Sequence, residues 1–268
     1  MNLGDALLLG VVQGVSEWLP ISSKTQIMLI STALFKSPPQ YAYSLGLFLE
    51  AASVIAALIY FRGLYLKALR GLLGDREGRR WLTYMVVTTI VTGAVGVPLY
   101  YIARKSLLAG QSAGWLMMAL GAAVVLNAAL LQRAKSAAGL KSFGQMSLRE
   151  MALVGLAQAL SVLPGVSRSG ATTTTLLLLG YKPEEAFKAS FVLVPIAGLG
   201  ATALSYIAEG GAVATAESLA AMAFGVVVSI ATIKALLDFA KSRHVVLVNA
   251  VVGLLAIAGG ILRITLGF

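Results

Sequence analysis

The sequence predicts an all-α polytopic membrane protein, with two re-entrant helical hairpins and six transmembrane helices in an inverted-topology repeat. Of its 268 residues, 58% are hydrophobic and only 12% are charged, a balance that is not typical of soluble globular domains. Two apolar stretches are each interrupted by a proline, Pro20 and Pro164. The second stretch repeats features of the first about 145 residues later, roughly half the chain.

Composition also limits the class of function. We expect one membrane domain, residues 1–268. The net charge of +10, in so apolar a chain, indicates Lys and Arg in cytoplasmic loops beside anionic lipid rather than a nucleic-acid partner. The absence of cysteine excludes disulfides and thiolate chemistry, and the single histidine, His244, cannot form a multi-histidine metal site. The first ten residues lack the features of a signal peptide, so we expect them to belong to the structure.

The first hairpin is predicted within residues 3–35. A helix over Leu3–Trp18 should end at Pro20, and Ser22 or Ser23 should cap a second helix that runs to about Phe35. Each piece is shorter than the roughly 20 residues that span a membrane. Two short helices joined by a break predict a hairpin that dips into the membrane and returns to the same side.

Three full-length spans should follow, at about Tyr41–Phe61, Trp81–Ala103 and Ser112–Leu131. Two basic loops, one between the first and second spans and one after the third, should be cytoplasmic. Their basic residues are Arg62, Lys67, Arg70, Arg76, Arg79 and Arg80 in the first loop, and Arg133, Lys135, Lys141 and Arg149 in the second.

The same plan recurs in the second half. Met151–Gly180 predicts another hairpin, and three spans follow at about Glu184–Ile207, Leu219–Phe239 and Val245–Leu266. An odd number of spans in each half inverts the second repeat (about 149–268) relative to the first (about 1–134). With the basic loops inside, both termini should lie outside. Arg104 and Lys105 depart from this plan, because their loop should also lie outside.

Matching residues support the repeat. Residues 10–13 (GVVQ) recur as 155–158 (GLAQ), which makes Gln158 the counterpart of Gln13. Residues 17–20 (EWLP) recur as 161–164 (SVLP). Two short strings can agree by chance, but the matching layout of a hairpin and three spans argues against coincidence.

The second break carries the pattern of an anion site. Residues 163–175 read LPGVSRSGATTTT, and a helix should begin near Ser169. A helix start offers unpaired N–H groups and a positive dipole end, and the Arg168 guanidinium with neighbouring hydroxyls would suit a phosphate. The alternative is an ordinary loop with a solvated arginine, which the apolar surroundings disfavour. The candidate phosphate-binding residues are Ser22, Gly165, Ser167, Ser169, Gly170 and Thr172.

The first break carries a carboxylate and two hydroxyls. Gln13 and Glu17 are four residues apart and share a helix face. Three roles are open for Glu17: pairing with Arg168, binding a divalent cation, or accepting a proton. Ser22 and Ser23 fit either helix capping or a nucleophile. A hard cation with oxygen ligands would fit Gln13, Glu17 and a diphosphate.

Three further polar residues are candidates without a settled role. Lys24 either adds positive charge to the site or extends to the membrane interface. Glu50 lies mid-span, and its spacing names no partner. Gln158 is a candidate only as the repeat counterpart of Gln13.

With QGVSEWLPISS at residues 13–23 and PGVSRSG at 164–170, the chain resembles the undecaprenyl-diphosphate phosphatase family of the bacitracin-resistance type along its whole length. The resemblance extends to the EEAF and SFVLVP stretches that follow. It implies the hairpin-and-span fold above, usually as a homodimer. It also implies removal of the terminal phosphate from a polyprenyl diphosphate, with Mg²⁺ or Ca²⁺, at the outer face of the cytoplasmic membrane. The product would be recycled as a carrier for cell-envelope sugars.

The resemblance also implies roles for single residues. Gln13 and Glu17 match the family's (Glu/Gln)-x-x-x-Glu motif, Ser23 its catalytic serine, Arg168 its phosphate-binding cation, and Thr172 a supporting donor.

One position departs from the family pattern. The family's first motif usually ends Ser-Ser-x-Gly-His, whereas Gln26 stands here in place of the histidine. A glutamine amide is neither acid nor base at physiological pH. Glu17 would then carry proton transfer alone, or activity would be reduced, or the substrate would differ.

Hydrolysis is the first hypothesis: Ser23 attacks the terminal phosphorus or positions a water, and charge stabilisation supplies most of the acceleration. Inverted repeats with broken helices are also transporter architecture, so a polyprenyl-phosphate flippase or an anion carrier is the alternative. Binding of the lipid without turnover is a third, weaker possibility.

Overall fold

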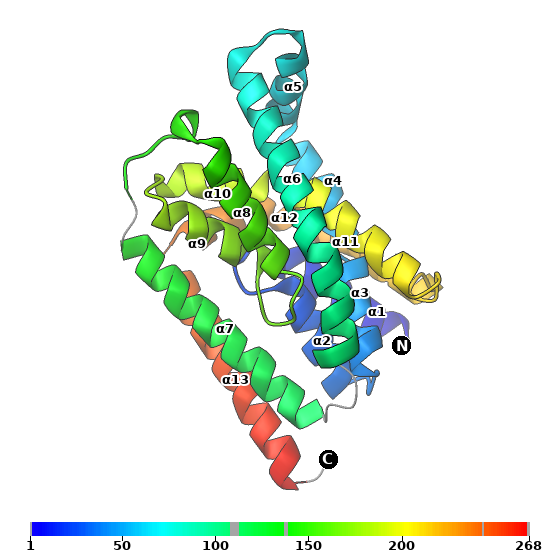
Figure 1. Cartoon of the computed structure of the whole chain (residues 1–268). Coiled ribbons are helices and arrows are strands. Elements are labelled where there is room, and N and C mark those ends of the chain that lie inside the picture. Colours follow the sequence, from blue (N-terminus) through cyan, green and yellow to red (C-terminus); the bar gives the residue numbers. More distant parts are fainter. Residues whose placement is uncertain (1, 108–112, 137–138, 243, 267–268) are drawn as a thin grey trace.

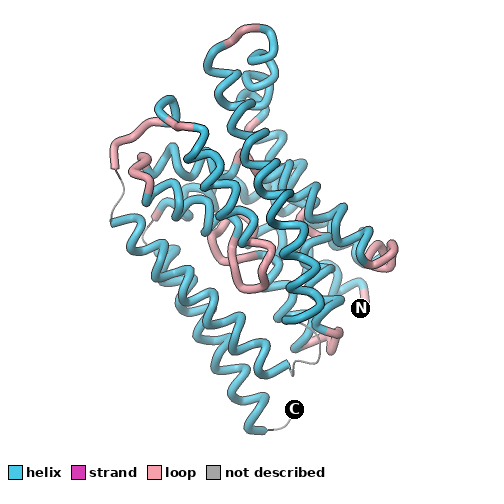
Figure 2. The backbone as a smooth tube through the Cα atoms, viewed as in Figure 1, coloured by secondary structure: helices cyan, strands magenta, loops and turns pink. Residues whose placement is uncertain are grey.

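The computed structural model describes residues 2–107, 113–136, 139–242 and 244–266, and these residues are helical without any β-strand (Figures 1 and 2). The α-helices are α1 (Leu3–Ser16), α2 (Ser23–Ala33), α3 (Pro39–Phe48), α4 (Ala51–Tyr60), α5 (Arg62–Arg70), α6 (Arg76–Ile102), α7 (Ala113–Ser136), α8 (Leu148–Leu160), α9 (Arg168–Leu178), α10 (Pro183–Phe191), α11 (Val194–Ala208), α12 (Ala216–Lys241) and α13 (His244–Leu266). The predicted all-α class is therefore confirmed.

Six helical stretches within the described residues are long and apolar enough to cross a membrane. These membrane-length helices are Pro39–Tyr60, Arg76–Lys105, Gly114–Ser136, Pro183–Ala208, Ala216–Lys241 and His244–Thr265. They coincide with the six predicted spans, apart from residue 112, which lies outside the described residues. The predicted hairpin stretches each contain two shorter helices, α1 with α2 and α8 with α9.

Two of the six spans are not the continuous helices that the sequence predicts. The first is divided into α3 and α4 around Leu49 and Glu50, and the fourth into α10 and α11 around Val192 and Leu193. Pro195 explains the second break, because its ring nitrogen cannot donate to the carbonyl four residues earlier. No proline stands at the first break.

Local signals set where the helices begin. Asn2 and Asp5 form a capping box on α1, and Ser147 and Glu150 form one on α8. Pro39 and Pro183 each open a helix, a position where the missing N–H costs nothing. Ser167 caps α9 by accepting the Gly170 N–H, so that helix begins one residue before the predicted start at Ser169.

Three long pairings hold the helices together: α1 packs along α12, α8 along α6, and α7 along α13, the last pair forming one side of the molecule (Figure 1). Glycines allow the closest approaches. A Cβ on Gly121 would lie 2.5 Å from the Gly253 carbonyl oxygen, and one on Gly10 would lie 2.6 Å from the Ala221 carbonyl oxygen. Any larger residue at these points would force the paired helices apart.

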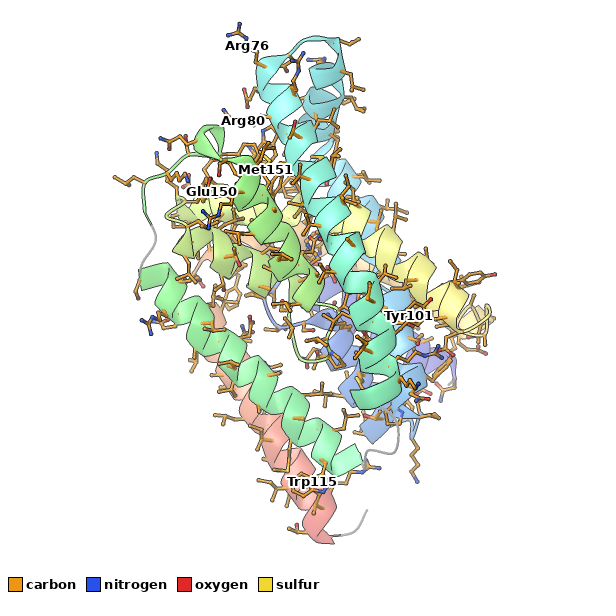
Figure 3. The ribbon with its side chains drawn as sticks, in the orientation of Figure 1. Arg76, Arg80, Tyr101, Trp115, Glu150 and Met151 are labelled. Atoms are coloured by element: carbon orange, nitrogen blue, oxygen red, sulfur yellow. The ribbon has the colours of Figure 1, made fainter. Side chains whose placement is uncertain are left out.

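The basic connections gather at one end of the molecule. Arg76 and Arg80 lie at the end that also carries Glu150, whereas Tyr101 and Trp115 lie toward the opposite end (Figure 3). Arg104, which departs from the predicted charge plan, is not a free charge. Its guanidinium lies 2.7 Å from a carboxylate oxygen of Glu209 and also donates to the Ala208 carbonyl.

Glu150, which lies outside the membrane-length helices, caps α8 with a titratable carboxylate. Burial alone would raise the pKa of Glu150, but hydrogen bonds from Lys141, Ser147 and Tyr181 outweigh it and lower the pKa to about 2. The contribution of Glu150 to stability is therefore complete above its ordinary pKa of 4.5 and is lost as the pH falls toward about 2. We expect the melting temperature in detergent to fall more steeply over this pH range for the native protein than for Glu150→Gln, which keeps a capping side chain without its charge.

Glu184→Gln, at an exposed position at the start of α10, is the matched control and should follow the native curve. Equal slopes for the native protein and Glu150→Gln would contradict the prediction.

Candidate active site

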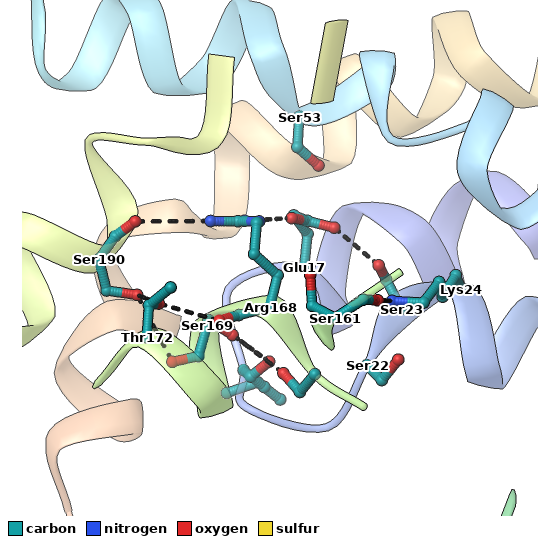
Figure 4. Close-up of polar contacts among 12 residues, drawn as sticks. Glu17, Ser22, Ser23, Lys24, Ser53, Ser161, Arg168, Ser169, Thr172 and Ser190 are labelled. Carbon is teal, nitrogen blue, oxygen red and sulfur yellow. Dashed lines mark hydrogen bonds and ion pairs between the residues drawn. The ribbon is translucent and has the colours of Figure 1, made fainter. Parts of the chain in front are cut away.

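The two proline breaks meet in the interior of the molecule (Figure 4). The Gly165 N–H at the second break donates to Thr25 Oγ1 at 3.0 Å, and the Ser22 hydroxyl donates to the Val166 carbonyl at 3.3 Å. Lys24, on α2, also donates to the Val166 carbonyl, at 3.0 Å, and to the Ser161 carbonyl. These bonds matter because a break in a helix leaves carbonyls that lipid cannot satisfy. Each break thus supplies the donors that the other needs.

A buried ion pair lies at this junction. Arg168 Nη2 lies 2.5 Å from Glu17 Oε1, and the two side chains are only 7% and 6% exposed. The other arm of the guanidinium points to the Ser190 carbonyl, at the long distance of 3.5 Å. Of the three roles that the sequence leaves open for Glu17, pairing with Arg168 is present in the structure.

The second oxygen of the same carboxylate receives a serine hydroxyl. Ser23 Oγ donates to Glu17 Oε2 at 2.7 Å, and Gln13 Nε2 donates to that oxygen at 3.0 Å. A hydroxyl that donates to a carboxylate is arranged to lose its proton to it, which is the geometry of an activated nucleophile.

Ser22 is placed differently from Ser23. It occupies the N-cap position of α2, but its side chain makes no capping bond, so the predicted capping by Ser22 is wrong. Its φ angle of 62° lies in the left-handed region that a non-glycine residue rarely adopts. The Ser22 hydroxyl meets Thr25 Oγ1 at 2.8 Å, away from the carboxylate. This strained residue turns the chain so that Ser23, the next residue, faces Glu17.

The predicted phosphate-binding hydroxyls of the second break already have protein partners. Ser167 accepts the Gly170 N–H at 3.1 Å, and Ser169 Oγ donates to the Leu19 carbonyl at 3.2 Å. Thr172 Oγ1 donates to the Arg168 carbonyl at 2.9 Å, and it meets Ser190 Oγ at 2.6 Å (Figure 4). Substrate binding would have to exchange some of these bonds.

The two glycines of the PGVSRSG motif are required by the backbone conformation and by close packing. Gly165 has a φ of 90°, which glycine adopts without strain. A Cβ on Gly170 would lie 2.6 Å from Asn127 Oδ1, so this position must stay small.

A narrow cleft joins the polar residues. Its lining residues are Ser16, Glu17, Leu19, Ser22, Ser23, Lys24, Glu50, Ser167, Arg168 and Ser169. Two carboxylates face two cations in this cleft, so their formal charges cancel. Among the described residues, no group of three or more His, Cys, Asp or Glu could hold a metal ion without help from a ligand.

The three residues without a settled role lie in different places. Lys24 is buried with its amine on the second break, and it does not extend to the interface. Glu50 is also buried and lines the cleft, yet its carboxylate has no hydrogen-bond or ion-pair partner among the described residues. Gln158 lies outside the cleft and donates to Thr92 Oγ1 at 3.0 Å, while its own Oε1 has no partner.

Gln26, the residue that departs from the family pattern, is turned away from the carboxylate. Its amide donates to the Ile21 carbonyl at 3.2 Å, and its side chain is not among those that line the cleft.

Four residues at the junction were not predicted from the sequence. Asn127 and Asn249, on α7 and α13, both donate to the Pro20 carbonyl, at 2.7 and 2.8 Å. A polar amide inside an apolar span is a signal that could have identified both. Thr25 and Ser190 carry no such signal, because hydroxyls are common on the surfaces of membrane helices.

Comparison with known proteins places the chain in a family. A family model described as "Bacitracin resistance protein BacA" matches residues 6–258. A Pyrobaculum aerophilum protein named undecaprenyl-diphosphatase is 75% identical over 264 residues, which are 98% of this chain and 99% of that protein. A Pyrobaculum islandicum protein with the same name is 72% identical over 266 residues, 99% of each chain.

A more distant relative, from Saccharolobus solfataricus, carries the name undecaprenyl-diphosphatase as well. It is 42% identical over 268 aligned positions, covering 96% of this chain and 95% of that protein. The resemblance that the two break motifs predict is therefore confirmed: the chain belongs to the bacitracin resistance protein BacA family.

Proposed function

We propose that this protein is a membrane phosphatase that removes the terminal phosphate of undecaprenyl diphosphate, releasing the monophosphate for reuse as a lipid carrier. One observation carries the proposal: a buried serine hydroxyl donates to a carboxylate that is itself paired with an arginine, at the meeting point of two helix breaks. The relatives' shared name gives the substrate, and it favours hydrolysis over the flippase or anion carrier that the same architecture would allow.

The residues divide the reaction between them. Ser23 Oγ attacks the terminal phosphorus, or positions a water that does, while its proton moves to Glu17 Oε2. The bond between phosphorus and the bridging oxygen breaks, and the lipid monophosphate leaves with that oxygen. If Ser23 is the nucleophile, water then hydrolyses the phosphoserine. Arg168 stabilises charge on the transferred phosphoryl group, and its Nη1, whose bond to the Ser190 carbonyl is long at 3.5 Å, is the guanidinium nitrogen that can be redirected to phosphate at least cost.

We propose that a divalent cation, Mg²⁺ or Ca²⁺, accompanies the diphosphate. The cleft's own charges cancel, so nothing in it balances the several negative charges of a diphosphate. Gln13 Oε1 is buried without a hydrogen-bond partner, and it lies on the residue that donates to Glu17. One amide oxygen, one carboxylate and phosphate oxygens are the donors that a hard cation prefers. When bound, the cation would neutralise phosphate charge.

Proton transfer falls to Glu17 in this proposal. Gln26 cannot titrate, and its amide is bound to the Ile21 carbonyl rather than directed at Ser23. The 2.7 Å bond from Ser23 to Glu17 supports a carboxylate acting without a histidine.

We also propose that α1–α2 and α8–α9 are re-entrant hairpins in an inverted repeat. The two halves share an order of elements: α1 to α4 correspond to α8 to α11, and α6 and α7 correspond to α12 and α13. The packing is reciprocal, because α1 pairs with α12 while its counterpart α8 pairs with α6. Such pairing between halves is expected when a two-fold axis in the membrane plane relates them.

The orientation in the membrane, the location in the cell and the oligomeric state are proposed from charge and from the family resemblance. The basic connections at one end of the molecule support a cytoplasmic position for that end. From the family resemblance we propose the cytoplasmic membrane, a site that opens to the outside, and a homodimer.

The first test is phosphate release. Purified protein in detergent should release phosphate from undecaprenyl diphosphate and farnesyl diphosphate with Mg²⁺ or Ca²⁺, and chelation by EDTA should slow it at least about tenfold until cation returns. If EDTA does not change the rate of phosphate release, the proposed cation is excluded but the proposed phosphatase activity is not. No release with any cation would contradict the phosphatase, and transbilayer movement of lipid in liposomes would then support a carrier.

Replacing Ser23 by alanine tests the nucleophile. Loss of the hydroxyl should lower kcat by about 10³-fold, since no other hydroxyl among the described residues donates to Glu17. Ser31→Ala is the matched control, because Ser31 is also a buried serine on α2 but does not line the cleft. If Ser23→Ala turns over at the native rate, Ser23 is not the nucleophile.

The buried ion pair should be visible as coupling in stability. Glu17→Gln or Arg168→Gln alone strands one buried charge and should cost about 3–5 kcal/mol, whereas the double substitution should cost clearly less than the sum. Unfolding in detergent with increasing denaturant measures all four proteins without needing activity. Strictly additive losses would show that the two side chains do not depend on each other.

A further inference from the structure

One buried carboxylate in the cleft has no partner. Glu50 is 7% exposed and lines the cleft, yet no hydrogen bond or ion pair reaches its carboxylate among the described residues. It directly precedes α4, where an acidic side chain ordinarily accepts an N–H of the first helical turn, but it makes no such bond. A buried charge without a partner is strongly unfavourable, so the folded chain alone does not explain this residue.

The other carboxylate of the cleft is already occupied. Glu17 Oε1 pairs with Arg168, and Glu17 Oε2 accepts hydrogen bonds from both Ser23 and Gln13. A metal ion could approach these two oxygens only by displacing a protein donor. Glu50 is therefore the carboxylate of the cleft that a cation can bind without breaking a bond within the protein.

The backbone that carries Glu50 is held from two sides. Thr202 on α11 donates to the Phe48 carbonyl at 3.1 Å, just before the break between α3 and α4. One turn after Glu50, Ser53 Oγ accepts a hydrogen bond from Gln13 Nε2 at 3.4 Å, and Figure 4 shows Ser53 beside the buried ion pair. The break is thus anchored to α11 and to α1, which fixes the position of Glu50 relative to the cleft.

A bound diphosphate would give this carboxylate a ligand to share. It would bring several negative charges into the space that Glu50 lines, and like charges repel strongly in an interior of low dielectric constant. Either a proton on Glu50 or a cation between the two groups would relieve the repulsion. The cation is favoured, because it satisfies carboxylate and phosphate together, whereas a proton would leave the charge of the diphosphate in place. Mg²⁺ commonly binds through one or two carboxylates together with substrate phosphates.

We propose that Glu50 is the carboxylate ligand of the divalent cation and joins that cation to the diphosphate. This inference rests on the proposed phosphatase function. It divides the work between two carboxylates in one cleft. Glu17 holds Arg168 and receives the proton of Ser23, while Glu50 binds the cation.

The test measures cation binding directly, without turnover. Mn²⁺ replaces Mg²⁺, because the electron paramagnetic resonance signal of free Mn²⁺ reports how much is bound, and methylenediphosphonate supplies a head group that is not hydrolysed. Glu50→Gln keeps the shape but loses the charge, so it should weaken Mn²⁺ binding at least about tenfold. Glu50→Asp should recover part of this loss.

Glu209→Gln is the matched control, because Glu209 is also a largely buried carboxylate but lies outside the cleft, in an ion pair with Arg104. Its Mn²⁺ affinity should stay within about twofold of native.

Stability provides a second measurement. Without cation, Glu50→Gln should melt at or above the native temperature, because the substitution removes an unpaired buried charge. Mn²⁺ with methylenediphosphonate should then raise the melting temperature of the native protein more than that of the variant. A large fall in the melting temperature of the cation-free variant would reveal a structural role for the Glu50 charge and would overturn the inference.

The outcomes separate this inference from the function on which it rests. If Glu50→Gln binds Mn²⁺ as tightly as the native protein, Glu50 is not a ligand, which is the result expected if it carries a proton instead. Failure of the native protein to bind Mn²⁺ with methylenediphosphonate would also exclude the site. Phosphate release is measured in parallel: binding of Mn²⁺ through Glu50 without any hydrolysis would retain the cation site and reject the phosphatase.

Discussion

The ion pair between Glu17 and Arg168 is the interaction on which the rest of this structure depends. Each charge lies beside a different helix break, and neither would be tolerated alone in so apolar an interior. Pairing them requires the first helix break to lie against the second. Once the breaks are together, the donors of each, such as the Lys24 amine and the Gly165 N–H, satisfy groups on the other. The electrostatic requirement thus determines the contact between the halves.

The breaks themselves are possible because distant helices support them. A proline at position 20 interrupts a helix where no water is expected to satisfy the backbone. The carbonyl of Pro20 receives two amide donors, Asn127 from α7 and Asn249 from α13. Those two helices approach closely enough because Gly121 and Gly253 face each other. A pair of glycines far from the chemistry therefore contributes to the position of the loop that carries Ser23.

Residue types alone predict much of this arrangement, but not all of it. The lengths of the apolar stretches predict six spans, and the two prolines predict the two breaks. An arginine and a glutamate in apolar sequence each need a partner of opposite charge, so a contact between them is expected. No proline marks the break at Leu49 and Glu50, and the bond from Lys24 to the Val166 carbonyl joins residues 142 positions apart. A local pattern carries no information about such partners, so Lys24 could not be distinguished from a side chain that reaches the interface.

The two helix breaks that were not predicted explain how Glu50 comes to line both the polar cleft and an adjoining, mostly apolar space. The interruption between α3 and α4 places Glu50 where it lines both spaces. At the interruption between α10 and α11, the Ser190 carbonyl accepts the Leu193 N–H at 3.3 Å and also faces Arg168 Nη1 at 3.5 Å. Unbroken helices would place neither group in this way. The same departures from regular helix therefore bring Glu50 and the Ser190 carbonyl to the buried arginine.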